Sequence, residues 1–216
     1  MKDLTKRFLT PSEQENIKNT VAAAEKTTSG EIMVMVVPSS YHYPTANLLG
    51  ATAISLPFSL ILTPLAGEFM WIGPQNMWVF LSIFTILFFL FYLTVKQIPW
   101  LKRLFIPKKE IEEEVEEAAL TCFYKQQLYK TRDETGILLF VSIFEHKAWI
   151  LADRGINEKL PSDTWDKIVD KMVSGIKEKR QVEAICQAVE AVGRMLSQHF
   201  PTKSDDTDEL KNLIID

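Results

Sequence analysis

The stretch SGEIMVMVVPSSYHYPTANLLGATAISLPFSLIL, residues 29–62, changes character halfway along. It opens with EIMVMVV, an apolar run that is typical of a strand buried on both faces. No charged residue then follows from position 43 to 67, or again from position 69 to 95. Each uncharged segment exceeds the roughly 20 residues that cross a hydrocarbon core about 30 Å thick. The sequence therefore predicts a strand followed by two membrane spans, at about 43–66 and 74–95.

The sequence indicates the second membrane span more strongly than the first. The second contains MWVFLSIFTILFFLFYLTV, which is apolar on every face of a helix. The first carries Pro57 and Pro64, so a re-entrant or interfacial segment stays open as an alternative. Aromatic residues near both ends of the second span favour a belt at each membrane interface. They are Trp71, Trp78, Tyr92 and Trp100.

Charge predicts the orientation of this hairpin. The tip between the spans carries only Glu68, whereas both flanks are basic. The flanking cations are Lys2, Lys6, Arg7, Lys18 and Lys26 before the first span, and Lys96, Lys102, Arg103, Lys108 and Lys109 after the second. Short loops that are rich in Lys and Arg stay on the cytoplasmic side of the membrane. No apolar run follows the first charges, so we expect no secretory signal. We expect a multi-pass protein of the cell membrane with both termini in the cytoplasm.

The flanks of the hairpin read as parts of a soluble domain. Thr10 and Glu13 have the spacing of a helical capping box, with Gly30 as the expected end of that helix. After the hairpin, the pattern predicts a helix over 108–130, then the strands TGILLFVSIF and KAWILAD joined by a tight turn at Glu145-His146. Two helices follow. Ser162 or Asp163 is the expected cap of the first, and Pro201 ends the second.

One strand and one helix cannot bury a core alone, so the strand at 31–37 must join the sheet formed after the hairpin. The predicted fold class is α/β: a small mixed β-sheet packed with helices and interrupted by a transmembrane hairpin. Residues 1–41 form the first part of the domain, 42–100 the hairpin, 101–201 the remainder, and 202–216 an acidic flexible tail. Docking of LKNLIID, at 210–216, is the alternative for the end of that tail.

Composition argues against several functions. The formal net charge of −4 leaves no overall basic field for nucleic acid. Cys122 and Cys186 lie far apart and show no ligand spacing, so we expect small core residues in a reducing compartment. The three histidines, at 42, 146 and 199, are too scattered for a metal cluster. Neither a glycine-rich phosphate loop nor a nucleophile elbow occurs in the sequence.

The best candidate site is LADRGINEKLPSDTWDK, residues 151–167. Asp153 follows a predicted strand, where open α/β sheets collect ligands. Asp153, Glu158, Asp163 and Asp166 could supply oxygen ligands to Ca²⁺ or Mg²⁺. Arg154 could bind a phosphate or a carboxylate. The favoured alternative is structural: Asp153 and Arg154 form a turn, and Asp163 caps a helix.

Five short matches, in order, resemble the TPM-domain family, which includes thylakoid-lumen phosphatase-like proteins. They are TSGEI (28–32), TGILLFVS (135–142), WILADRGI (149–156), Pro-x-x-x-Trp (161–165) and HFP (199–201). The resemblance implies a compact α/β sandwich with a small mixed sheet. It also implies one of three roles, since family members include acid phosphatases, calcium-binding proteins and assembly or repair factors of membrane complexes. The inserted spans resemble a bacterial branch of membrane proteins, which implies a bacterial inner membrane as the location. Better-known members carry an export signal and place the domain outside the cytoplasm, whereas the charge pattern here predicts a cytoplasmic domain.

The leading hypothesis is a membrane-anchored cytoplasmic module that binds a protein partner in the membrane without catalysis. Its expected role is in membrane-protein assembly or quality control, which rests on the resemblance alone. The alternative is a metal-assisted acid phosphatase that acts on phosphomonoesters through Asp153 and Asp163, with Ca²⁺ or Mg²⁺. Transport is disfavoured because the spans carry no ionisable residue at mid-membrane depth.

Overall fold

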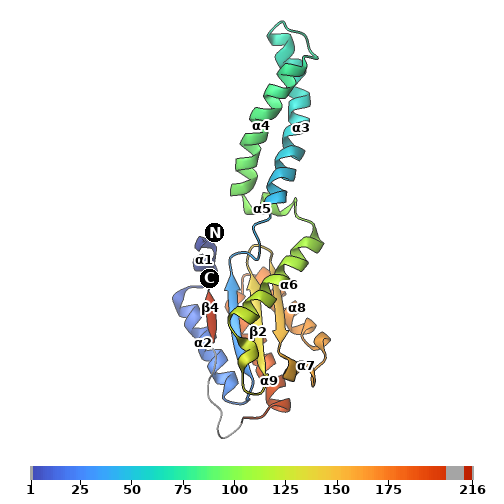
Figure 1. Cartoon of the computed structure of the whole chain (residues 1–216). Coiled ribbons are helices and arrows are strands. Elements are labelled where there is room, and N and C mark those ends of the chain that lie inside the picture. Colours follow the sequence, from blue (N-terminus) through green and yellow to red (C-terminus); the bar gives the residue numbers. More distant parts are fainter. Residues whose placement is uncertain (1, 203–211, 216) are drawn as a thin grey trace. The chain divides into compact units, whose positions relative to one another are not determined.

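The structure is a computed structural model that describes residues 2–202 and 212–215 (Figure 1). The chain divides into two compact units. The first is built from residues up to Tyr41 together with residues from Glu112 onward, and the second is His42–Ile111. The first unit is thus formed by two segments that are far apart in the sequence.

A four-stranded mixed sheet organises the first unit. Its strands are β1 (Glu31–Val37), β2 (Gly136–Ser142), β3 (Lys147–Ala152) and β4 (Leu213–Ile215), in the order β3-β2-β1-β4. The strand β1 pairs in parallel with β2 and β4, and β2 pairs antiparallel with β3. The strand before the insertion therefore joins the sheet formed after it, which confirms the predicted fold class.

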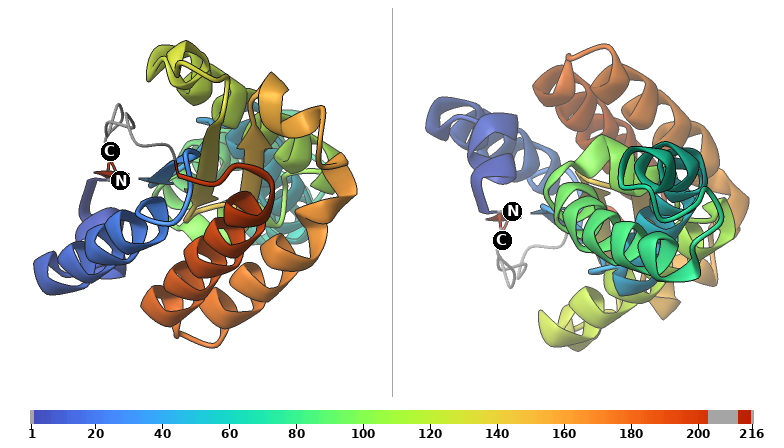
Figure 2. Two further views of the ribbon diagram at one scale, coloured as in Figure 1. Left: turned by 90° about the horizontal axis from the view of Figure 1, so that it is seen from below. Right: turned by 90° about the horizontal axis from the view of Figure 1, so that it is seen from above.

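Burial explains the sequence of each strand. Every residue of β1 and β2 is buried, as their unbroken apolar runs predicted, whereas β3 alternates between buried and half-buried positions. Figure 2 shows α6 on one side of the sheet and α2, α8 and α9 on the other. Alternate residues of β1 and β2, such as Ile32, Val34 and Leu139, share one core with these three helices. The unit is therefore a three-layered α/β sandwich.

The helices of this unit are α1 (Lys2–Phe8), α2 (Pro11–Glu25), α6 (Lys108–Lys125), α7 (Arg154–Asn157), α8 (Asp166–Lys177) and α9 (Gln181–His199). Residues of α6 before Glu112 belong to the second unit. The capping box is confirmed: the Thr10 hydroxyl accepts from Glu13 N, and the Glu13 carboxylate accepts from Thr10 N at 2.7 Å. Short 3-10 turns occupy Leu128–Lys130 and Ser162–Thr164.

Three local predictions were wrong. The helix expected to reach residue 130 ends at Lys125, because Gln127 takes a left-handed backbone with φ 61° and starts the 3-10 turn. Gly30 does not close α2, which ends at Glu25. A Cβ at Gly30 would lie 2.9 Å from Leu196 Cδ1, so glycine there permits close packing of α9.

The predicted cap of α8 was also wrong. Ser162 and Asp163 lie in the 3-10 turn, and α8 starts at Asp166 after Trp165, which makes no side-chain capping bond. Thr164 N donates to Pro161 O at 3.0 Å, so the backbone closes this turn by itself. Trp165 is buried in the core, and its packing fixes where α8 begins.

The predicted flexible tail falls mainly on 203–211, outside the described residues. Leu213–Ile215 instead forms β4, which corrects the prediction for these three residues. Val34 N donates to Asn212 O at 3.0 Å, and the Asn212 amide donates to Glu25 Oε2 at 3.0 Å. The short strand thus covers part of the edge of β1 that would otherwise present unpaired backbone groups.

The second unit consists of α3 (Pro44–Phe69), α4 (Met77–Gln97) and α5 (Pro99–Arg103), and α3 packs against α4. The helix α3 continues through Pro57 and Pro64. Small buried residues recur every fourth position along it, including Ser55, Ser59 and Thr63, whose hydroxyls donate to carbonyls of their own helix. This spacing lets two helices approach closely.

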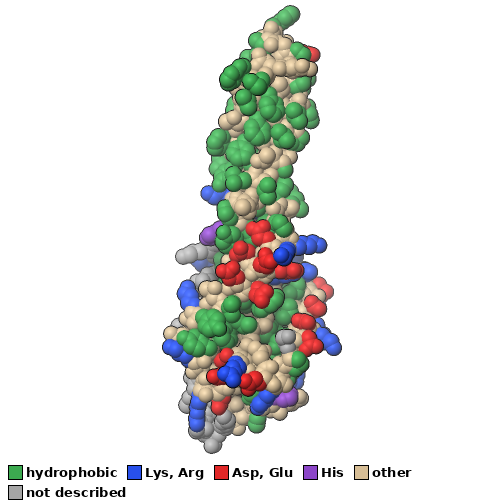
Figure 3. Space-filling model, turned by 45° about the vertical axis from the view of Figure 1, so that its right-hand side comes forward, with side chains coloured by type: hydrophobic (Ala, Val, Ile, Leu, Met, Phe, Trp, Pro, Cys, Tyr) green, Lys and Arg blue, Asp and Glu red, His purple; other side chains and the backbone are tan. Residues whose placement is uncertain are grey.

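By length and composition, α3 and α4 could each cross a membrane. Their most apolar windows have mean hydropathies of 1.8 and 2.3, yet only 28% and 6% of those windows are buried. Large apolar side chains therefore remain exposed along both helices, as the space-filling view shows (Figure 3). A helix in the core of a soluble protein would bury most of such a window.

Candidate functional site

The end of β3 carries the candidate site expected from the sequence. Asp153 directly follows the strand and is the N-cap of α7, where its Oδ1 accepts from Arg154 N at 2.7 Å. Asn157 Nδ2 donates back to Ala152 O at 2.7 Å and closes the turn. The predicted turn at Asp153 and Arg154 is therefore present, with Asp153 as its cap.

The second oxygen of Asp153 differs from the first. Oδ2 is buried and has no hydrogen-bond partner within 2–202 and 212–215. Trp165 Nε1, which follows in the candidate stretch, is likewise buried without a hydrogen-bond partner within the described residues. Buried polar atoms are nearly always paired, so an unpaired carboxylate oxygen is a point where an ion or a water could bind.

Arg154 lies at the surface and is already paired. Its Nε donates to Glu158 Oε1 at 2.9 Å, one helical turn along, and both side chains are mostly exposed. The hydrogen bond to Glu158, followed by the charges of Glu158 and Glu134, raises the pKa of Arg154 above its ordinary value. A guanidinium that is already paired with a carboxylate offers less to a phosphate or carboxylate ligand.

Gly155 explains why the turn is tight. A Cβ at this position would lie 2.7 Å from the carbonyl oxygens of both Asp133 and Glu134. Gly155 N donates to Glu134 O at 3.0 Å, and Glu134 itself has φ of +55°. The turn after β3 is therefore packed directly against the turn before β2, which leaves no space for a side chain between them.

The remaining candidate ligands do not converge. Asp163 is exposed in the 3-10 turn, and Asp166 is exposed in the first turn of α8. Within the described residues there is no group of three or more His, Cys, Asp or Glu side chains that could hold a metal ion. Asp153, Glu158, Asp163 and Asp166 thus provide separate carboxylates, of which only Asp153 has a buried unpaired oxygen.

The sequence did not predict a second buried carboxylate, which lies in the turn between β2 and β3. Glu145, expected only as a turn residue between β2 and β3, is fully buried. Its Oε1 accepts from Ser40 N at 2.9 Å and from the Ser39 hydroxyl at 3.1 Å, and its Oε2 accepts from the Ser142 hydroxyl. These groups lie at the carboxyl ends of the parallel strands β1 and β2, where α/β proteins often bind ligands. Here the carboxylate instead joins the exit of β1 to the β2–β3 turn.

The comparisons agree with this architecture. Residues 103–195 match the family model of the TPM domain. The chain therefore carries a TPM domain, as the resemblance in its motifs predicted. The match starts after β1, so the pairing of β1 with β2 extends this domain to a segment before the insertion.

A solved structure shares the fold. The chain is similar to the NMR structure of the BA42 protein from the psychrophilic bacterium Bizionia argentinensis, with a TM-score of 0.58 and 20% sequence identity. The similarity covers 96% of each chain. No curated protein matches the chain.

Proposed function

We propose that this protein is a membrane-anchored TPM domain that acts as a non-catalytic interaction module for another membrane protein, in assembly or quality control. The exposed apolar surface of α3 and α4 carries the proposal. Water would penalise that surface by about 25 cal/mol for each Å² of apolar area, whereas lipid would not. These two helices therefore need an apolar environment, which a lipid bilayer provides.

The cytoplasmic placement is part of the same proposal. Lys96, Lys102 and Arg103 follow α4 or lie at its end, whereas the segment between α3 and α4 carries no cation. The excess of positive charge near the membrane marks the cytoplasmic side. We therefore infer that the α/β unit lies in the cytoplasm and that the tip of the hairpin faces outward across a bacterial inner membrane.

Labelling of single cysteines with a membrane-impermeant thiol reagent tests anchoring and orientation together. Cys122 and Cys186 are first replaced by Ser, and then Trp71→Cys or Lys171→Cys is introduced at an exposed position. Trp71→Cys, at the tip, should react in intact cells, and Lys171→Cys, in α8, should react only after permeabilisation. The reverse pattern would contradict the orientation, and a protein found in the soluble fraction would contradict the anchor.

The interaction role is supported by the dispersal of the candidate catalytic groups. Arg154 is paired and exposed, and the carboxylates of Asp163 and Asp166 stand alone at the surface. An interaction module should co-purify from cross-linked membranes with a membrane protein. Lys177 and Lys171 provide exposed positions on α8 for a photoreactive group that reports which face is bound.

The alternative function is a metal-assisted phosphatase, and the buried unpaired Oδ2 of Asp153 is the observation that favours it. The test is hydrolysis of a generic phosphomonoester by the full-length protein, with and without Mg²⁺ or Ca²⁺. Asp153→Asn keeps an oxygen that can cap α7, and Asp166→Asn is the matched control on an exposed residue. Metal-dependent turnover that is lost in Asp153→Asn and kept in Asp166→Asn would replace the non-catalytic proposal.

A further inference from the structure

A pocket of about 390 Å³ opens in the α/β unit, and none of the candidate acids after β3 lines it. Its wall is apolar and comes from α1, β2 and α8: Phe8, Val141, Ile143, Val173 and Ile176. Four of these, all but Val141, are partly buried side chains that pack on the core and keep an exposed face. Pockets of this size and character commonly bind small apolar ligands.

The rim of this pocket is basic. Four residues that line it carry a positive or protonatable side chain: His146, Lys147, Lys177 and Lys179. Lys147 forms an ion pair with Glu112 at 2.8 Å. Within the described residues, the ammonium groups of Lys177 and Lys179 form no hydrogen bond or ion pair. A lysine at such a rim lays its methylenes along the apolar wall and holds its ammonium in water.

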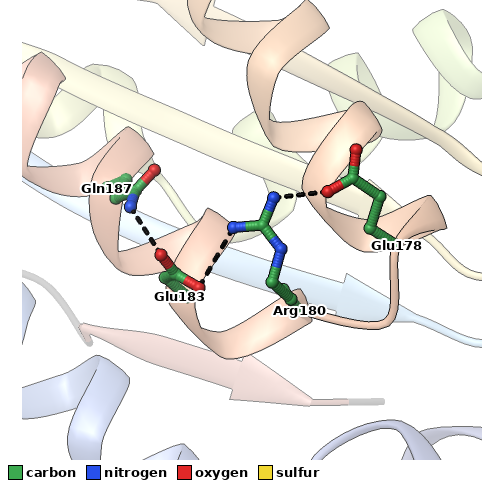
Figure 4. A network of polar contacts seen from close by, with 4 residues as sticks. All are labelled: Glu178, Arg180, Glu183 and Gln187. Carbon is green, nitrogen blue, oxygen red and sulfur yellow. Dashed lines mark hydrogen bonds and ion pairs between the residues drawn. The ribbon is translucent and has the colours of Figure 1, made fainter.

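The acid nearest to these lysines in sequence is engaged elsewhere. Glu178, between Lys177 and Lys179, accepts a hydrogen bond from Arg180, which also donates to Glu183 at 3.2 Å (Figure 4). Gln187 in turn donates to Glu183 at 3.0 Å. Arg180 therefore binds Glu178, at the end of α8, and Glu183, in the first turn of α9. The ammonium groups of Lys177 and Lys179 are left without a carboxylate partner.

Two rim residues are held in a backbone conformation that lysine and histidine seldom adopt. Lys179 has φ of +62° and His146 has φ of +51°. Lys179 follows the C-cap of α8 in a Schellman motif, with Lys179 N donating to Ile176 O at 3.0 Å and Arg180 N to Gly175 O at 2.9 Å. Glycine is the usual residue at this position. A cationic side chain thus stands at the rim where a glycine would be less strained.

We propose that this pocket binds a fatty acid, with its acyl chain against the apolar wall and its carboxylate between Lys177 and Lys179. The apolar wall selects a hydrocarbon chain, and the unpaired lysines select an anionic head over a neutral or cationic one. This site is separate from the proposed interaction role and does not depend on it, since all its residues belong to the α/β unit.

Photolabelling tests the site in the intact protein. The full chain, in nanodiscs of a zwitterionic phospholipid, is exposed to dodecanoate that carries a terminal diazirine, and the labelled peptides are mapped by mass spectrometry. Labels should fall on residues 141–147 and 173–179. Unlabelled fatty acids should compete, and each added methylene between C8 and C12 should strengthen competition about fourfold, as burial of a CH₂ predicts. Dodecanol and dodecyltrimethylammonium should compete poorly.

Substitutions at the rim and at the wall test separately how the carboxylate and the acyl chain of the fatty acid are bound. Lys177→Gln with Lys179→Gln should weaken competition by dodecanoate about five- to tenfold, because each exposed charge pair contributes modestly. Lys167→Gln with Lys171→Gln, on the same helix but outside the pocket, is the matched control and should change nothing. Val173→Trp fills the pocket and should abolish labelling. Circular dichroism identifies a variant that has unfolded, and Val173→Leu then serves as a milder filling variant.

Three results would overturn the proposal. The first is equal competition by dodecanol and dodecanoate, and the second is undiminished labelling in folded Val173→Trp or Val173→Leu protein. The third is a dimer that dissociates on Lys177→Gln with Lys179→Gln, which would assign the pocket to a second copy of this chain.

Discussion

Replacing Glu145 tests how the exit of β1 is fixed to the sheet. In Glu145→Ala the main-chain N–H of Ser40 and the buried hydroxyl of Ser142 lose their acceptor. A buried donor without a partner costs about 1–3 kcal/mol. Ser39 keeps a bond to Tyr41 O at 2.7 Å, so it adds little. Two such donors would cost about 2–6 kcal/mol, but Ser40 is only half-buried, so water can replace part of its bond. We therefore expect Glu145→Ala to lower the free energy of unfolding of the α/β unit by about 2–4 kcal/mol, a large share of the 5–15 kcal/mol typical of a domain.

Glu145→Gln tests the contribution of the charge separately from that of the hydrogen bonds. Its carbonyl oxygen can accept from Ser39 and Ser40, and its amide can donate to the Ser142 hydroxyl, which is both donor and acceptor. Only the contribution of the charge to these bonds is lost, so we expect a cost of about 1 kcal/mol.

Urea unfolding of the full chain in nanodiscs measures both variants, because on the proposed anchoring the helix pair stays in lipid while the α/β unit unfolds. Glu117→Ala, on the exposed side of α6, is the control and should lie within about 0.5 kcal/mol of the wild type. If Glu145→Ala were no more destabilising than Glu145→Gln, the hydrogen bonds of Glu145 would not hold the exit of β1, and the reasoning would fail.

Three further stability predictions use the same urea assay. Thr10→Ala removes the side-chain acceptor of the capping box and should cost about 1 kcal/mol; a neutral result would mean that α1 alone fixes the start of α2. Gly155→Ala places a methyl group 2.7 Å from two carbonyl oxygens and should cost about 1–3 kcal/mol, whereas an unchanged unfolding midpoint would show that the 133–134 turn can move. Lys179→Gly removes a lysine with a left-handed backbone from the end of α8. The relief of strain exceeds the entropy that glycine adds to the unfolded chain, so the variant should stabilise the unit by about 0.5–1 kcal/mol. Destabilisation would show that the lysine side chain supports the fold.

The sequence predicted the features that depend on local pattern or on elementary packing. The capping box at Thr10 needs only neighbouring residues, and the strand before the insertion could not remain unpaired. The two apolar helices followed from runs without charge. Each of these depends on properties that residues keep in any context.

The errors arose where distant residues decide the outcome. Glu145 looked like a surface turn residue, because its partners Ser39 and Ser40 lie more than a hundred positions earlier. Asp163 looked like a helix cap until the burial of Trp165 fixed the start of α8. The candidate acids after β3 are close in sequence, yet the turn and two helices present them separately.

The pairing of β1 with β2 means that β1 is synthesised long before its neighbour in the sheet. Val37 lies opposite Ser142, which the ribosome adds 105 residues later. At about 5–20 residues per second, a nascent strand of seven buried residues, six of them apolar, waits roughly 5–20 s for its neighbour. Throughout that interval the apolar strand has no partner in the sheet, and on the proposed membrane anchoring the two apolar helices enter the bilayer before the strand is paired.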